Sequence, residues 1–359
     1  MRQRQLLKQW YHFSRGRYND IIISYPLTHS SIYGILDICN NLPLRKIESD
    51  MLGLCCQFLE PRTKRDGSTV FENSINEQSM QLGRFKSGAY NTAYIQNVYR
   101  NNVEEIIKLI PKLVANNIHC FRMSSNIFSL WEFNNHIAKQ DDLLISRLNH
   151  CGNLFKINNI RVTTHPGQFT VLSSDSDNVV CNSIMELDYH AWTFDQMNLP
   201  QSPDNAINIH GGKANRSAKL ISVINSLPYH IKSRLTLEND ETSYNIMDLI
   251  NIHDATGVPV CWDSHHHTFN DAGIPALEAF HLAIMTWDNT GCKPLQHISN
   301  SIPGQENGNY TERRKHSDYI HNIPQPQLLG LQNNLIDLEV EAKMKNLAID
   351  KMRKYFIIS

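Results

Sequence analysis

The sequence predicts an α/β fold, a closed (β/α)8 barrel, on two observations. From residue 50 onward, short β-branched or apolar runs alternate with longer segments of helical period, without internal repeats or low-complexity tracts. Eight such short runs occur, and eight strand–helix units favour a closed parallel barrel over an open sheet. The predicted strands are Met51–Gln57, His119–Met123, Ile160–Thr164, Ala206–His210, Leu235–Glu238, Val258–Asp263, Leu295–Ser299 and Leu335–Val340.

Helices are expected between these strands, where apolar residues recur with a helical period. The candidates are Val98–Asn116, Asp141–Ile157, Ala214–Ser226, Tyr244–Ala255, Pro275–Met285 and, after the last strand, Glu341–Phe356. One barrel domain, residues 50–359, accounts for the pattern. Residues 1–49 fit it poorly and are interpreted as an N-terminal extension of unknown order. Residues 59–95 are expected to form a long polar first loop, a place where barrels often carry function.

Composition places the chain among ordinary globular proteins. Of its 359 residues, 41% are hydrophobic and 19% are charged, which excludes a disordered chain. The formal net charge is −1, so any contact with nucleic acid must come from a local basic surface. Eight cysteines without a C-x-x-C pair indicate buried free thiols, which are typical of an intracellular, reducing compartment such as the cytoplasm or nucleus. No apolar run reaches the roughly 18 residues of a membrane span.

The first residues of the chain are basic. Five positive side chains precede the first acidic residue, Asp20: Arg2, Arg4, Lys8, Arg15 and Arg17. A mitochondrial transit peptide, a DNA-contacting arm and a plain basic tail are three interpretations of this pattern.

Several polar side chains stand where predicted strands end. His165, His210, Glu238, Asp263 and His297 lie at or beside the ends of five different strands. Because all strands of such a barrel open at one carboxyl-terminal mouth, we expect these side chains to converge on one pocket. Mixed imidazole and carboxylate ligands suit divalent zinc, manganese or iron. A lone histidine in a strand is more often a hydrogen-bonded core residue, but the coincidence at five strand ends favours a metal site.

The run Asp-Ser-His-His-His at residues 263–267 adds imidazoles just beyond one of these strands. A loop that curls back there would bring His266 to the same metal. His265 and His267 would then point elsewhere.

Residues 164–170, Thr-His-Pro-Gly-Gln-Phe-Thr, predict a strand followed by a tight turn that presents Gln168 and Phe169 at a loop tip. An amide beside an exposed aromatic ring can enter a base stack and fill the space of a displaced nucleotide. The alternative is a simple turn with Phe169 folded beneath it, and the turn alone favours this alternative.

Other basic or glycine-rich segments are less specific. Residues 210–213, His-Gly-Gly-Lys, lack the spacing of a phosphate-binding loop. Arg62, Lys64 and Arg65 in the first loop and Arg313–Lys315 are candidates for phosphate contacts. A solvated helix face explains the later series Lys343, Lys345, Lys351, Arg353 and Lys354 equally well.

Five segments resemble the UV damage endonuclease family in order and spacing. They are residues 164–169 (Thr-His-Pro-Gly-Gln-Phe), 209–212 (Ile-His-Gly-Gly), 235–241 (Leu-Thr-Leu-Glu-Asn-Asp-Glu), 258–263 (Val-Pro-Val-Cys-Trp-Asp) with His266, and 340–345 (Val-Glu-Ala-Lys-Met-Lys). The resemblance runs from about Leu52 to Lys345. It implies a TIM barrel with a cluster of two or three divalent metal ions, most often manganese, with zinc or magnesium as alternatives. It also implies DNA-repair incision 5′ to UV photoproducts and a distant similarity to endonuclease IV.

The resemblance further implies roles for individual residues. The implied metal ligands are His165, His210, Glu238, Asp263, His266, His297, His316 and Glu341. Glu238 and Glu341 would bridge or position metals, and Lys343, or alternatively Lys345, would stabilise a phosphate oxygen. Gln168 and Phe169 would probe the lesion, Phe169 standing where tyrosine is more usual. The implied partner is damaged double-stranded DNA, and a monomer is expected because one barrel builds the whole site.

The chain also departs from the family pattern. A ligating histidine of the family would fall near Phe133, and His136 is the nearest substitute. Leu295 replaces a modified, metal-bridging lysine, with Lys293 the nearest lysine, and Leu54 replaces an aromatic residue that assists lesion probing. These departures bear on the third metal, the metal affinity and the range of lesions.

Two other functions fit parts of the pattern. A metal-dependent sugar isomerase or epimerase would use the same barrel and similar ligands. A damage-recognition protein that binds lesions without cutting is the second, because the bridging lysine is missing.

Overall fold

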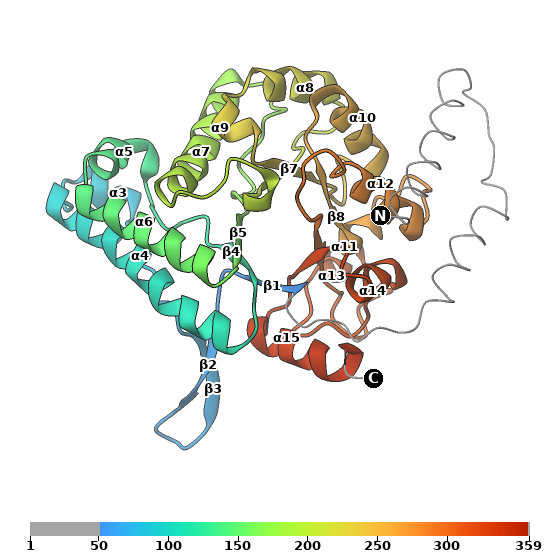
Figure 1. The fold of residues 1–359 in the computed structure, drawn as a ribbon, viewed down its shortest axis with the longest axis horizontal. Helices are drawn as coiled ribbons and strands as arrows, with labels where there is room; N and C mark the ends of the chain where they lie inside the picture. Colours follow the sequence, from blue (N-terminus) through green and yellow to red (C-terminus); the bar gives the residue numbers. More distant parts are fainter. Residues whose placement is uncertain (1–50, 358–359) are drawn as a thin grey trace. The chain divides into compact units, whose positions relative to one another are not determined.

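The computed structural model describes residues 51–357, in which helices surround a closed barrel of eight parallel strands (Figure 1). The strands follow the order β1-β10-β9-β8-β7-β6-β5-β4, and β4 pairs back with β1. Their bounds are β1 Leu52–Cys55, β4 Cys120–Met123, β5 Arg161–Thr164, β6 Ile207–His210, β7 Leu235–Glu238, β8 Val260–Asp263, β9 Leu295–Ile298 and β10 Asp337–Val340. The predicted fold class is therefore confirmed, and each barrel strand lies within a predicted run.

The helices occupy the segments between the strands, as expected. They are α3 Leu82–Lys86, α4 Thr92–Ala115, α5 Trp131–Lys139, α6 Asp142–Ile157, α7 Asp177–Gln196, α8 Ser217–Ser226, α9 Tyr229–Lys232, α10 Ile246–Thr256, α11 Ser264–His267, α12 Ala276–Met285, α13 Tyr310–Arg313, α14 Gln325–Gln332 and α15 Lys345–Met352, with short turns of other helix types at Pro203–Asn205 and Arg353–Ile357. Helix α4 begins earlier than predicted because the Asn91 side chain caps it, accepting a hydrogen bond from the Tyr94 N–H at 2.9 Å. The predicted start of the last helix at Glu341 is wrong, since the Glu341 N–H still donates to Ile298 in the barrel ladder.

The first loop is more ordered than the sequence predicts. It contains an antiparallel hairpin of β2 (Leu59–Thr63) and β3 (Thr69–Asn73), which extends away from the barrel (Figure 1). The hairpin is fixed at its base, where the Leu59 N–H donates to the Asn346 side chain at 2.7 Å and Glu60 pairs with Lys112 at 2.9 Å. Arg62 is held by Glu72 at 2.7 Å within the hairpin, which leaves it less available for a phosphate than the sequence suggests.

Side chains alternate along each strand between the barrel interior and the surrounding helix layer. In β1, Leu52 and Leu54 are buried in the main apolar core, whereas a Cβ atom on Gly53 would meet Glu339 and Cys120. Gly53 therefore faces the interior. Leu54 faces the helices and does not lie at the mouth of the barrel.

The amino-terminal floor of the barrel is closed by Arg161. Its guanidinium donates to the carbonyl oxygens of Pro203, Asp204 and Lys293 and to the carboxylate of Asp337, all between 2.8 and 2.9 Å. Just above, Leu295 is fully buried in a small apolar cluster with Cys120, Ala206, Cys261 and Trp287.

Within residues 51–357, no helix has the combination of length and apolar character needed to cross a membrane. The predicted N-terminal extension and its basic residues lie outside the described residues.

Candidate metal centre

The site converges on Glu238, the last residue of β7. Its carboxylate is fully buried, and three histidine nitrogens lie 3.1 Å from its oxygens: His165 Nε2, His266 Nδ1 and His297 Nδ1. The Asn208 side chain, one strand away, donates a further hydrogen bond to Oε2. Strand ends that are far apart in the sequence thus meet at one point, as the barrel geometry predicts.

His266 reaches this point because Asp263 caps a helical turn. The Asp263 carboxylate accepts hydrogen bonds from the backbone N–H groups of His265 and His266 at 2.7 and 2.8 Å, which begins the short helix α11. The turn directs His266 back toward Glu238, as expected. It directs His267 away, and His267 Nε2 lies 3.0 Å from the Ile274 carbonyl oxygen.

His165 and His210 stand side by side, with ring centroids 5.2 Å apart. His165 Nδ1 lies 3.0 Å from the Pro166 carbonyl oxygen, which turns Nε2 toward Glu238. After His210 the chain needs glycine, because a Cβ atom on Gly211 would lie 2.4 Å from the ring of Tyr244. Gly211 therefore allows the chain to pack closely against Tyr244.

Glu341 and His316 complete the ring of predicted ligands. His316 Nδ1 lies 3.7 Å from Glu341 Oε2, and His297 Nδ1 lies 3.5 Å from Glu341 Oε1. Oε1 also pairs with Arg122 at 2.6 Å. The structure thus brings together all eight residues that the resemblance implies as ligands.

The charges of this cluster compensate one another. Burial alone would raise the pKa of Glu238, but the histidines around it, His297 and His210 foremost, hold that pKa well below its usual range. Burial would lower the pKa of His266, yet Asp263 and Glu238 raise it well above the ordinary value. The pKa of His210 is lowered, mainly by burial. Glu238 is therefore held as a carboxylate, the form that binds cations.

These residues fit a divalent metal. Buried polar atoms normally have hydrogen-bond partners, but several here have none among the described residues: His210 Nδ1, Glu238 Oε1, Asp263 Oδ2 and both ring nitrogens of His297. Ligand atoms within 4.8 Å of one another form three groups, all sharing Glu238: with His165 and His210, with Asp263 and His266, and with Cys261 and His297. Such mixed nitrogen and oxygen donors are what zinc, manganese and iron accept.

The remaining predicted site residues lie outside this cluster. Lys343 is exposed, and its amine lies 3.9 Å from Asp318. Gln168 and Phe169 occupy an exposed turn closed by the Thr170 N–H on the Gly167 carbonyl, and Phe169 is 83% exposed. The alternative in which Phe169 folds beneath the turn is therefore wrong.

The substitutes considered for the missing family residues are not brought to the site. His136 belongs to α5, where no described contact joins it to Glu238 or its neighbours, and Phe133 is 42% exposed against Phe85. The amine of Lys293 pairs with Asp337 at 2.9 Å, beside the floor of the barrel. The mouth of the barrel therefore receives no lysine from position 293 or position 295.

Sequence reasoning missed a polar layer directly beneath the cluster. Arg122, Thr163 and Glu339 are buried and linked, since Thr163 donates to Glu339 and Arg122 lies 3.5 Å from it. The signal was present, because Thr163 and Glu339 stand two residues before His165 and Glu341 and so share their inward face.

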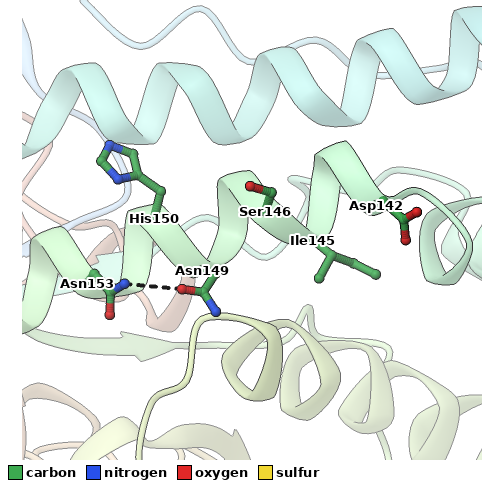
Figure 2. Close-up of a pocket in the computed structure, with 6 residues that line it drawn as sticks. All are labelled: Asp142, Ile145, Ser146, Asn149, His150 and Asn153. Atoms are coloured by element: carbon green, nitrogen blue, oxygen red, sulfur yellow. Dashed lines mark hydrogen bonds between the residues drawn. The ribbon is translucent and has the colours of Figure 1, made fainter.

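A shallow surface hollow lies apart from this site, along α6 (Figure 2). It is lined by Asp142, Ile145, Ser146, Asn149, His150 and Asn153, and Asn153 donates to Asn149 at 3.1 Å. None of these residues belongs to the Glu238 cluster.

Comparison with known proteins assigns the barrel to a family. Residues 69–356 match the family described as UV-endonuclease UvdE. The chain is 34% identical to a UV DNA damage endonuclease of Nostoc over 89% of its length and 95% of that protein, and 30% identical to one of Deinococcus radiodurans over 84% and 94%.

Solved structures show the same fold. The crystal structure of SacUVDE matches with a TM-score of 0.69 at 24% identity, covering 86% of this chain and 99% of that one. Endonuclease IV of Thermus thermophilus matches with a TM-score of 0.50 at 10% identity, over 70% and 93%. The fold, the family match over most of the barrel and the two relatives agree with the predicted resemblance, and the chain belongs to the UV-endonuclease family.

Proposed function

We propose that this protein is a metal-dependent DNA-repair endonuclease that incises the phosphodiester 5′ to UV photoproducts, and to other lesions, in double-stranded DNA. The observation that carries the proposal is the convergence of histidines and carboxylates on Glu238 at the mouth of a barrel of the UV-endonuclease family. We further propose that it acts as a monomer in a reducing intracellular compartment, in keeping with the free cysteines among the described residues.

The proposed ligands are the eight residues around Glu238, and the proposed cofactor is two or three divalent ions, manganese first and zinc or magnesium as alternatives. When bound, these ions would supply a water made acidic enough to attack near neutral pH and would stabilise charge on the phosphate and the leaving 3′ oxygen. Glu238 and Glu341 hold negative charge at the centre of the ligand set. Lys343, at the rim, is proposed to contact a phosphate oxygen.

Glu241 joins the ligand set to the basic rim. Its Oε1 accepts a hydrogen bond from Arg314 Nε at 2.7 Å and lies 3.8 Å from His266 Nε2. A carboxylate beside the second nitrogen of a metal-binding histidine orients the ring. Arg313, stacked over Phe269 at 4.7 Å, and the exposed Lys315 flank this contact and would face phosphates.

Replacing Phe169 with alanine is expected to reduce discrimination between damaged and undamaged DNA by about tenfold, because stacking of a base on an aromatic side chain is worth about 1–3 kcal/mol. Thermal stability should stay unchanged, since the ring is 83% exposed. Competition binding with a lesion duplex and its undamaged counterpart measures the effect. Tyr229→Ala, which removes a ring 74% exposed on α9, is the control and should leave discrimination intact. Equal discrimination by wild type and Phe169→Ala would contradict the proposed probing role.

The proposed function is tested by incision of a 5′-labelled duplex that carries a single thymine dimer, with manganese and with an EDTA control. Metal-dependent cutting immediately 5′ to the dimer is expected. Tight binding to the dimer without a nick would favour a damage-recognition protein. If the protein neither binds nor cuts the duplex, a sugar isomerase or epimerase is favoured.

A further inference from the structure

His297 is held between two buried carboxylates. Its Nδ1 lies 3.1 Å from Glu238 and its Nε2 lies 2.9 Å from Glu339, and all three side chains are fully buried. Neither ring nitrogen has an aligned hydrogen-bond partner among the described residues, although a carboxylate lies on each side of the ring. A neutral imidazole has one N–H and one lone pair, and only the lone pair binds a metal.

The two sides of the ring differ in what they offer. The Nδ1 side faces the shared carboxylate of the candidate metal groups, where His165 and His266 also point. The Nε2 side faces Glu339, and the cluster of buried residues that includes Leu295 and Cys120 lies beneath it. Cys261 of that cluster also comes within 4.8 Å of His297 in a candidate metal group. A metal at Glu238 therefore needs the lone pair on Nδ1 and the proton on Nε2.

Glu339 is itself built into the barrel. Thr163 donates a hydrogen bond to Oε1, and Arg122 lies 3.5 Å from Oε2 and partly compensates its charge. Gly53 on the adjacent strand leaves room for the side chain, since a Cβ atom there would come within 3.0 Å of Glu339 Cγ. The carboxylate is thus fixed in place without any contribution from a metal.

We propose that Glu339 is a positioning residue that accepts the Nε2 proton of His297 and so fixes the tautomer in which Nδ1 faces the metals. The proposal deepens the proposed function, on which it rests for the presence of metals. A carboxylate behind a metal-binding histidine both orients the ring and makes its free nitrogen a better donor.

Two measurements on the full chain test this role. Titration of Mn²⁺ into Glu339→Gln, followed by calorimetry, should show affinity reduced about 10- to 100-fold, the usual effect of losing such a partner. Asp337→Asn, on the same strand but at the barrel floor, is the control and should bind Mn²⁺ as wild type does. Nitrogen-15 NMR of histidine-labelled protein in EDTA, at a pH high enough to leave the imidazole of His297 neutral, reports the tautomer directly. The His297 signal, assigned by its loss in His297→Gln, should show Nε2–H in wild type and a mixture in Glu339→Gln.

Several results would overturn the proposal. An Nδ1–H tautomer in wild type would do so, as would unchanged affinity and tautomer in Glu339→Gln. Complete loss of Mn²⁺ binding in Glu339→Gln would make Glu339 a ligand instead. If Glu339→Gln fails to fold, Thr163→Val replaces it. This variant should lose Mn²⁺ affinity in the same direction but to a smaller extent. An unchanged tautomer together with an unchanged affinity in Thr163→Val would count against the role of Glu339. If wild type binds no Mn²⁺, the proposed metal dependence fails, and the tautomer in EDTA still tests Glu339.

Discussion

Replacing Glu238 with glutamine is expected to reduce incision of a thymine-dimer duplex at least about a thousandfold, because several kcal/mol of transition-state stabilisation depend on bound metal. Glutamine keeps the size of the side chain but removes the charge that the three candidate metal groups share. The neighbouring histidines would then have no common anion between them. Single-turnover incision kinetics at saturating manganese measure the loss.

The fold should survive this change, since the amide fills the same space. In EDTA, circular dichroism and thermal unfolding of Glu238→Gln should therefore match wild type closely. Asp337→Asn is the matched control, because it removes an interior carboxylate that pairs with Arg161 and Lys293 at the other end of the barrel. Incision by Glu238→Gln at the wild-type rate would exclude Glu238 from the proposed site.

Removing metal is expected to abolish incision and also to destabilise the protein. A ligand present at a thousand times its Kd stabilises the folded state by about 4 kcal/mol, which is roughly 5 °C in Tm for a chain of this size. The cluster should respond this way because buried atoms of His210, Glu238 and Asp263 have no hydrogen-bond partner among the described residues. Thermal unfolding in EDTA and after addition of manganese measures the difference.

Thermal unfolding of Glu238→Gln in EDTA and in manganese distinguishes manganese binding at the Glu238 cluster from general effects of salt. Its Tm should respond much less to manganese than that of wild type. Identical Tm values for wild type in EDTA and manganese, together with incision in EDTA, would show that the Glu238 cluster does not depend on metal.

The barrel was predictable from the sequence because its strands are short, buried runs set between amphipathic helices. The hairpin of β2 and β3 was not predictable in the same way. Its residues are largely exposed, Pro61 interrupts the run, and no apolar alternation signals pairing. The end of strand β10 at Val340 was predicted correctly, but the last helix was placed too early, because the Glu341 N–H still donates to the barrel ladder and α15 begins only at Lys345.

The candidate site was predictable to the extent that strand ends mark it. His165, His210, Glu238, Asp263 and His297 follow from that rule, whereas His316 lies in a loop and came only from the family resemblance. The buried partners Arg122 and Glu339 were missed because a charged residue within a strand is ordinarily taken as solvent-facing. The spacing of two residues between Glu339 and Glu341 signals that Glu339 points inward, but only the three-dimensional structure shows that Arg122 lies 3.5 Å from it and compensates its charge.

The guanidinium of Arg161 closes the amino-terminal end of the barrel through contacts that involve none of the residues at its mouth. Three carbonyl oxygens and one carboxylate accept hydrogen bonds from this side chain, and the small apolar cluster that contains Leu295 lies above it. The Arg161 network and the proposed metal site therefore lie at opposite ends of the same short strands. Residues at the mouth can then vary without loss of the contacts that hold the base of the barrel together. Protein engineering can likewise substitute residues at the mouth while it keeps the Arg161 network unchanged.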